Sequence, residues 1–321
     1  MNNSNYFLEV FGKLKITAVH SNNLAIQYNS EVMKRFSKTI NVFWWIPVGV
    51  ILILGLVLGA SYDLEIAKAV YSKDNLFGII IECVGSLPGY ALVGFVGPLL
   101  YITVRDSDKN WLKYLGFAAF FLIPLISGAV YGYDVFYAKL KLIGLFGGAV
   151  ITLCLDAIFY FFFNRADSKV AFKDACIIAL SFGITFIMVF FMKRFIERPR
   201  FIYVSEHLDA FKPFLDTSSN LQGVDKDLLD SFPSGHSALA STFLLFPLLS
   251  KYNVRTEKHS HFFFLGAALW LLVTMFGRMS DGHHYLTDVS FGALMGTLIS
   301  FIAYFISEFI KIEDKDEASD E

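Results

Sequence analysis

Residues 40–60 read INVFWWIPVGVILILGLVLGA, a run without a single charged side chain. A helix needs about 20 largely apolar residues to cross the hydrocarbon core of a bilayer, so this run predicts a transmembrane helix. Comparable runs follow along the chain, and the sixth is the shortest because Lys251 closes it early. The eight predicted spans are 40–60, 86–105, 112–132, 141–163, 173–194, 236–251, 262–279 and 288–311.

The composition of the whole chain agrees with this pattern. Of its 321 residues, 55% are hydrophobic and 17% are charged, which is typical of a protein with many membrane spans rather than a soluble one. The predicted fold class is therefore an all-α polytopic membrane protein with about eight transmembrane helices. Residues 61–85 carry Asp63, Glu65 and Lys68 among apolar positions, which favours a helix lying along the membrane interface.

The charges and cysteines exclude several kinds of partner. The formal net charge is −2 and the charges are scattered, so no basic face is available for nucleic acid, and we expect no nucleic-acid partner. The three cysteines, Cys83, Cys154 and Cys176, form no CxxC pair and lie in or beside apolar stretches. This placement predicts that the cysteines are small buried residues rather than metal ligands. We expect no metal site and no cofactor.

The distribution of lysine and arginine predicts the orientation. If eight spans alternate, the basic N-terminal arm and three basic loops fall on one side, which the positive-inside rule makes cytoplasmic. Those loops carry Arg105 and Lys109, Arg165 and Lys169, and Arg255 and Lys258. We therefore expect a multi-pass protein of the plasma (inner) membrane, with residues 1–39 as a cytoplasmic arm and residues 312–321 as an acidic cytoplasmic tail.

The segment 193–200 reads KRFIERPR. The helix before it should end near Glu197, because a residue that precedes proline is disfavoured in the α region. Lys193 then lies at the helix end and Arg200 opens the following loop. An ammonium group and a guanidinium group hold a phosphoryl group in complementary ways, so both are candidate phosphate ligands. Taken alone, the segment also fits basic residues that anchor a helix end among lipid headgroups.

The segment 231–238 reads SFPSGHSA and runs directly into the sixth apolar stretch. Proline and serine before apolar sequence are typical of a helix start, whose free amides bind anions. Ser234 would add a hydroxyl and Gly235 an amide, while His236 can give and take a proton near neutral pH. Taken alone, an ordinary helix cap followed by a surface histidine is also open.

The segment 277–288 reads GRMSDGHHYLTD and adds a third cation, Arg278. His284 precedes Asp288 by four residues, which places both side chains on one helix face. An aspartate that accepts the imidazole N–H fixes the tautomer and leaves the other ring nitrogen free to attack. A hydrogen bond that only secures the helix end is the alternative. His283 points elsewhere on such a helix, and we expect no role for it.

With the predicted topology, all three segments emerge on the same outer face. Taken together, they resemble the signature of the type 2 phosphatidic acid phosphatase (PAP2) superfamily, K-x6-RP, PSGH and SR-x5-H-x3-D. The matching residues are Lys193 and Arg200, Pro233, Ser234, Gly235 and His236, and Arg278, His284 and Asp288. Phe201 stands where the family usually has proline, and Gly277 where it often has serine.

The resemblance covers about residues 190–290. It implies a PAP2-like catalytic transmembrane core over residues 173–311, preceded by N-terminal transmembrane helices over residues 40–172. It also implies a substrate, a lipid phosphate with a phosphomonoester or diphosphate headgroup, and an active site on the outer face among membrane lipids. The lipid itself and the oligomeric state are left open.

The resemblance further implies a metal-free hydrolysis in two steps. His284, oriented by Asp288, would attack phosphorus and form a phosphohistidine. His236 would protonate the leaving oxygen and then activate the water that hydrolyses the intermediate. The phosphoryl oxygens would be held by Lys193, Arg200, Ser234, the Gly235 amide and Arg278.

Two other functions stay open. A lipid phosphotransferase on the same scaffold would pass the phosphoryl group to an acceptor other than water, and a transporter would bind a lipid phosphate without hydrolysing it. Asp156 lies in the fourth predicted span, where an unpaired charge costs about 2.5–3.5 kcal/mol. A charged residue at such a cost keeps the transporter hypothesis under consideration. We expect a hydrogen bond within the bundle to satisfy Asp156. The acidic loop 201–232 would either cover the site or lie in solvent.

Overall fold

The structure is a computed structural model that describes residues 22–309 except 141, 166, 217–220 and 222. The chain divides into two compact units, Met1–Phe36 and Ser37–Glu321. In the first unit, the described residues form the beginning of helix α2 (Asn22–Val70). Residues 22–39 of the predicted arm therefore belong to a helix, whereas residues 1–21 and the predicted tail 312–321 lie outside the described residues.

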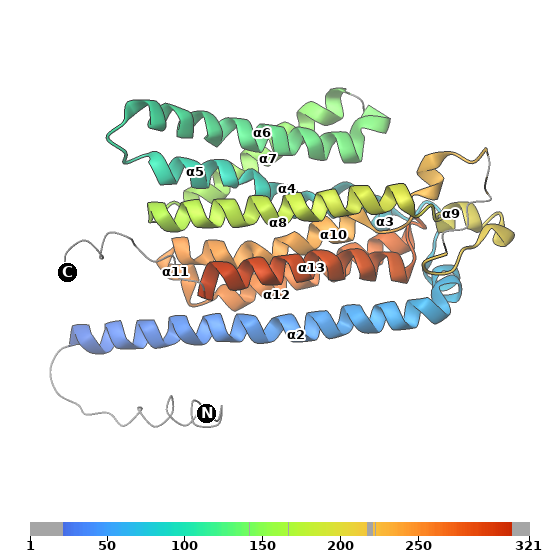
Figure 1. The fold of residues 1–321 in the computed structure, drawn as a ribbon, viewed down its shortest axis with the longest axis horizontal. Helices are drawn as coiled ribbons and strands as arrows, with labels where there is room; N and C mark the ends of the chain where they lie inside the picture. The colour runs from blue at the N-terminus through green and yellow to red at the C-terminus, as the bar shows by residue number, and fades with distance from the viewer. Residues whose placement is uncertain (1–21, 141, 166, 217–220, 222, 310–321) are drawn as a thin grey trace. The chain divides into compact units, whose positions relative to one another are not determined.

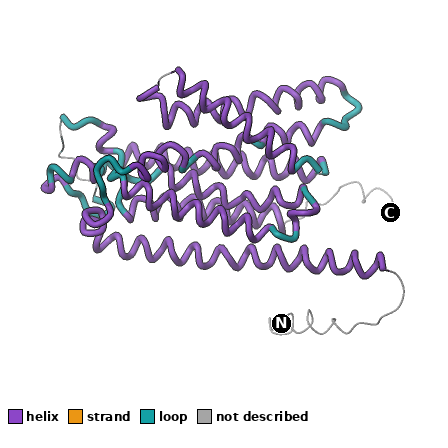
Figure 2. Tube along the Cα trace, turned by 180° about the vertical axis from the view of Figure 1, so that it is seen from behind, coloured by secondary structure: helices purple, strands orange, loops and turns teal. Residues whose placement is uncertain are grey.

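The described part of the second unit consists of helices joined by short loops, without a strand (Figures 1 and 2). After α2, the longer helices are α6 (Asn110–Leu140), α7 (Leu142–Phe162), α8 (Ser168–Phe195), α12 (Ser260–Ser280) and α13 (Leu286–Phe309). The shorter α-helices are α3 (Leu76–Val84), α4 (Leu87–Gly94), α5 (Val96–Val104), α9 (Phe201–Val204), α10 (Gly235–Thr242) and α11 (Val254–Glu257), and the 3-10 helices are η1 (Leu208–Ala210), η2 (Lys226–Leu229) and η3 (Phe243–Tyr252).

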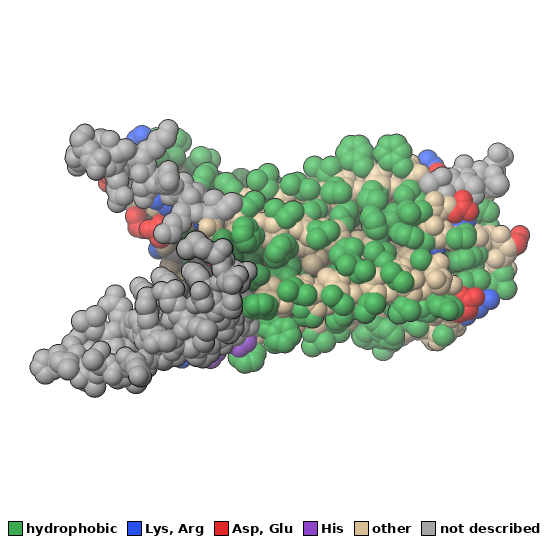
Figure 3. Space-filling view, turned by 60° about the horizontal axis from the view of Figure 1, so that its bottom comes forward, with side chains coloured by type: hydrophobic (Ala, Val, Ile, Leu, Met, Phe, Trp, Pro, Cys, Tyr) green, Lys and Arg blue, Asp and Glu red, His purple; other side chains and the backbone are tan. Residues whose placement is uncertain are grey.

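Seven segments of the described chain are long and apolar enough to cross a membrane, by length and composition. Figure 3 shows apolar side chains over the middle of one face of the molecule, with charged side chains near its ends. The predicted all-α polytopic membrane fold is confirmed. The seven segments are Val42–Val70, Leu76–Val104, Asn110–Val135, Leu142–Phe162, Ser168–Phe195, Ser260–Ser280 and Leu286–Phe309.

The sixth predicted span, 236–251, is built differently from the others. It is divided between α10 and the 3-10 helix η3, which contains Pro247. Helices α8, α12 and α13 pack around α10, and glycines allow this close approach: a Cβ at Gly292 would lie 2.4 Å from the Ser234 carbonyl oxygen, and one at Gly89 2.3 Å from that of Leu239. This central position holds the start of α10 firmly between its neighbours.

Residues 61–85, predicted as one interfacial helix, are divided in the structure. α2 kinks at Tyr62 and ends at Val70, and the second apolar segment begins at Leu76 rather than at residue 86. Asp63 lies inside the protein, where Arg198 and Thr287 satisfy its carboxylate. A charged side chain with buried partners is compatible with a membrane helix.

Asp156 in α7 is 1% exposed. The hydrogen bond predicted for it does not form, since neither of its carboxyl oxygens has a hydrogen-bond partner. Its neighbour is Gly94, at the end of α4, where an added Cβ would lie 2.2 Å from Asp156 Oδ2. The carboxyl is therefore enclosed by closely packed helices rather than by polar groups.

Candidate active site

The three motif segments meet at the end of the bundle where α8 ends and α10 and α13 begin (Figure 1). Lys193 Nζ, in the last turn of α8, donates to the Asp230 carbonyl oxygen at 2.9 Å. The Ser234 amide, at the start of α10, donates to the Asp288 carbonyl oxygen of α13 at 3.1 Å. These contacts join segments that are far apart in the sequence, so the structure brings the predicted site residues together.

His284 lies in the loop between α12 and α13 and is 2% exposed. Its Nδ1 atom is 2.6 Å from the backbone carbonyl oxygen of Ser231. Because a carbonyl oxygen can only accept, Nδ1 carries the ring hydrogen and Nε2 has the free lone pair. Burial, together with the positive charges of Arg278 and Lys193, holds the pKa of His284 well below its usual value. The ring is therefore neutral at neutral pH, which is the form that can act as a nucleophile.

Asp288 does not contact His284 in the way that the four-residue spacing predicts. Its Oδ2 accepts from the Ser231 hydroxyl at 2.6 Å and from the Tyr285 amide at 2.9 Å, and its Oδ1 accepts from Arg198 at 2.5 Å. The spacing fails because His284 precedes the first residue of α13, Leu286, so the two side chains do not share one helix. Ser231, which sequence analysis missed, lies between Asp288 and His284 and contacts both.

Arg198 is a second residue that sequence analysis missed. It is 1% exposed and binds Asp288 and Asp63 of α2. Two signals in the sequence pointed to Arg198. The first was the Arg-Pro pair at 198–199, although the spacing from Lys193 favoured Arg200. The second was the isolated carboxylate of Asp63 in an apolar stretch. A carboxylate buried among helices needs a cation, and Arg198 supplies it.

Arg200 and Arg278, the two predicted guanidinium ligands, each hold one carboxylate. Arg200 binds Asp227 through both Nη atoms at 3.1 Å, and Arg278 binds Asp281 at 2.5 Å. The Nε atoms of both arginines are buried and have no hydrogen-bond partner. Unsatisfied buried donors are rare in native proteins. Two such donors on neighbouring cations are suited to donate hydrogen bonds to one bound anion.

The start of α10 carries the remaining predicted anion ligands. The Ser234 hydroxyl is buried and caps the helix by accepting from the Ser237 amide at 3.4 Å. It also accepts from the Ser237 hydroxyl at 3.1 Å and keeps its own hydrogen for another acceptor. An added Cβ at Gly235 would meet only Val189, at 3.5 Å. Space is therefore open beside the first amides of the helix, where anions bind.

His236 is held by a residue outside the predicted site. Its Nε2 atom donates to the backbone carbonyl oxygen of Glu82, in α3, at 3.0 Å, which leaves Nδ1 as the nitrogen able to exchange a proton. Glu82 carried no sequence signal, because a backbone carbonyl can come from any residue. His283 lies on the same side, with Nδ1 3.0 Å from Asp281 Oδ1 and Nε2 4.0 Å from Glu82 Oε1.

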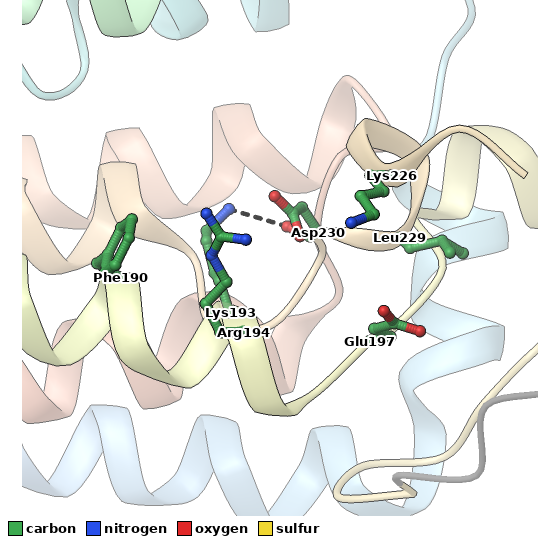
Figure 4. Close-up of a pocket in the computed structure, with 7 residues that line it drawn as sticks. All are labelled: Phe190, Lys193, Arg194, Glu197, Lys226, Leu229 and Asp230. Atoms are coloured by element: carbon green, nitrogen blue, oxygen red, sulfur yellow. Dashed lines mark hydrogen bonds between the residues drawn. The ribbon is translucent and has the colours of Figure 1, made fainter.

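A pocket of about 320 Å³ opens beside Lys193. Figure 4 shows Lys193 of α8 and Lys226 of η2 reaching towards Asp230. The pocket combines two apolar side chains with both signs of charge, and Lys193 connects it to the residues around His284. Its lining residues are Phe190, Lys193, Arg194, Glu197, Lys226, Leu229 and Asp230.

Comparison with known proteins gives one family match, over the part of the chain that carries the three motif segments. Residues 174–311 match the model of the PAP2 superfamily. No curated protein and no solved structure matches the chain. The matched range contains Lys193, Arg200, the segment 233–236 and the loop that carries Arg278 and His284, and the apolar helices fit the integral-membrane branch of the family. Residues 174–311 are therefore similar to the PAP2 superfamily.

Proposed function

We propose that this protein is a metal-independent lipid phosphate phosphatase that hydrolyses a phosphomonoester or diphosphate headgroup through a phosphohistidine. One observation carries the proposal. The buried Nε donors of Arg200 and Arg278 have no partner, and both cations lie near a neutral imidazole, that of His284. An anion with several oxygens would satisfy both donors while its central atom faces the histidine.

In the first step, the lone pair of His284 Nε2 attacks phosphorus as the bond from phosphorus to the leaving oxygen breaks. Burial and the charge of Arg278 hold the pKa of His236 below its usual value, and the negative charge of a bound phosphate favours the cationic ring, which then gives its Nδ1 proton to the leaving oxygen. The phosphorylated ring is cationic, because Nδ1 keeps its hydrogen, and the Ser231 carbonyl oxygen stabilises this hydrogen through the 2.6 Å contact.

In the second step, neutral His236 takes a proton from water, and the water oxygen attacks phosphorus. The bond from phosphorus to Nε2 breaks, and inorganic phosphate leaves with His284 again neutral. Lys193, Arg200 and Arg278 hold the equatorial oxygens in both steps, together with the Gly235 amide and the Ser234 hydroxyl. Phosphoryl transfer depends mainly on such positioning and charge stabilisation.

The surroundings of the pocket support a lipid as the substrate. Phe190 lines the pocket and is 51% exposed on α8, so an apolar helix face leads to the cations. A lipid could keep its chains against that face while its phosphate enters the site. The positive-inside rule supports an orientation in which this end of the bundle lies on the outer side of the plasma membrane.

The test is release of inorganic phosphate from a panel of lipid phosphates by the detergent-purified protein in EDTA, beside His284→Ala. We expect release by the wild type and none by the variant, and an acid-labile, base-stable phosphoenzyme in the wild type alone. Equal release by His284→Ala would remove the nucleophile assignment. Release that requires an added acceptor alcohol would identify a phosphotransferase, and binding without release would favour a transporter.

A further inference from the structure

A chain of buried contacts leads from α2 to His284. It runs from Asp63 to Arg198, then to Asp288, then to Ser231, and ends at the imidazole. Asp63 lies outside residues 174–311, the range that matches the PAP2 family. The contacts therefore connect a helix outside the family region to the proposed nucleophile.

Asp63 is 4% exposed and is fully engaged with the C-terminal part of the chain. Its Oδ2 accepts from Arg198 Nη2 at 2.8 Å and from the Thr287 hydroxyl. Its Oδ1 accepts from the Thr287 amide at 3.0 Å. A buried carboxylate with three donors from two segments fixes those segments relative to each other.

Arg198 cannot act as a phosphate ligand like Arg200. Its Nε donates to the Lys212 carbonyl oxygen at 3.1 Å, and its Nη1 binds Asp288 at 2.5 Å. With Nη2 on Asp63, all three guanidinium nitrogens are occupied, and the group lies 4.2 Å from the centre of the Tyr285 ring. Arg198 therefore holds other residues in place.

The series of buried contacts reaches Ser231 by two routes. Arg198 binds Asp288, which accepts from the Ser231 hydroxyl, and the Arg198 carbonyl oxygen accepts from the Ser231 amide at 3.0 Å. Ser231 in turn supplies the carbonyl oxygen that accepts from His284. The position of the Ser231 carbonyl oxygen fixes the orientation of the imidazole ring, and therefore the direction in which Nε2 points.

We propose that Asp63 and Arg198 are positioning residues that aim His284 through Asp288 and Ser231, so that α2 is part of the catalytic unit. The proposal rests on the function proposed above. Neither residue touches the substrate. Substitution of a residue that orients a reacting group typically lowers the reaction rate by about 10–100-fold. We expect substitution of Asp63 or Arg198 to lower the rate of phosphoenzyme formation more than it changes KM.

The structure offers a matched control. Asp174 is 0% exposed and binds Lys251 at 2.7 Å, Ser307 Oγ at 2.5 Å and the Tyr252 hydroxyl. It is a buried aspartate with three partners, as Asp63 is. It lies near the other end of α8 from Lys193, about 28 Å away at 1.5 Å per residue.

The experiment compares Asp63→Asn with Asp174→Asn in detergent-purified full-length protein. Phosphoenzyme formation is measured in a single turnover, and thermal unfolding is measured in parallel. We expect both variants to lose thermal stability, whereas only Asp63→Asn lowers the rate, by about tenfold or more, with KM changed less than threefold. Equal rates in the two variants would overturn the proposal and leave Asp63 with a role in stability alone.

Two further measurements cover the cases in which a variant fails to fold or the wild type lacks turnover. Ser231→Ala removes only the hydroxyl link, and its effect on the rate should be less than additive with that of Asp63→Asn. Additive effects would contradict a shared chain.

Orthovanadate binding is the second readout. If the wild type binds vanadate without releasing phosphate, the proposed function falls, and weaker vanadate binding by Asp63→Asn than by Asp174→Asn still supports positioning. If the wild type shows neither binding nor turnover, both proposals are overturned.

Discussion

The Nδ1 atom of His284 lies 2.6 Å from the Ser231 backbone carbonyl oxygen, while the Asp288 carboxylate binds the Ser231 hydroxyl at 2.6 Å. The proposed nucleophile therefore donates to a backbone acceptor, and the carboxylate holds the residue that provides this acceptor through its side chain. A backbone acceptor cannot be removed by replacing a side chain. This relationship makes the expected effects of substitutions at His284 and Asp288 different.

We predict that Asp288→Asn lowers the rate of phosphoenzyme formation by about 10–100-fold but does not abolish it, because the Ser231 carbonyl still accepts from His284. His284→Ala should remove the phosphoenzyme altogether. His283→Ala is the neighbouring control and should stay within about threefold of the wild type, because the His283 side chain contacts Asp281 and Glu82 rather than the ring of His284. Loss in Asp288→Asn as complete as in His284→Ala would require direct contact between Asp288 and the ring.

His236→Ala should separate the two steps. A substrate with a good leaving group, such as p-nitrophenyl phosphate, needs little protonation of its leaving oxygen, so the variant should still form the phosphoenzyme. Hydrolysis of that intermediate should slow by about 10²–10⁴-fold, because no base activates the water. Rapid-quench measurement should show the phosphoenzyme accumulating. Unchanged decay of the intermediate would exclude His236 as the base.

The pair formed by Arg200 and Asp227 should compete with phosphate. The Asp227 side chain is 72% exposed, whereas that of Arg200 is 12% exposed, so the ion pair contributes only about 0–1 kcal/mol. Asp227→Asn should free the guanidinium and tighten inhibition by inorganic phosphate by up to about fivefold. Asp225→Asn in the same loop is the control and should not change the inhibition constant. Weaker inhibition in Asp227→Asn would mean that Asp227 orients Arg200.

The pH dependence follows from the lowered pKa of His284, whose main cause is burial. The unfolded ring titrates near its usual pKa of about 6.5, so the unfolded state binds more protons below that pH, and the contribution of His284 to stability falls as the pH falls. The nucleophile itself should stay neutral to below about pH 6.5.

The measurement is kcat/KM against pH in His236→Ala, corrected for the separately measured ionisation of the substrate, because kcat/KM reports the free enzyme. An acid limb clearly above pH 6.5 that remains after this correction would contradict the assignment.

Much of the fold was predictable because its signals are local. An uncharged run such as residues 40–60 must be a helix in a bilayer, where each backbone polar group needs an internal partner. The motif residues Lys193, His236 and His284 were likewise visible from their types and spacing. The family match over residues 174–311 agrees with that part of the interpretation.

The amino-acid sequence by itself determined that most of the chain forms membrane helices and which residue types are concentrated between the apolar segments, because hydrophobicity and spacing belong to single segments. Only the tertiary structure decided which partner each group has. Arg198 meets Asp63 across 135 residues, and His236 meets the Glu82 carbonyl across 154. Such pairs depend on the rotation and packing of whole helices, which decide which buried charge faces which. For the same reason, Asp288 came to support Ser231 instead of contacting His284.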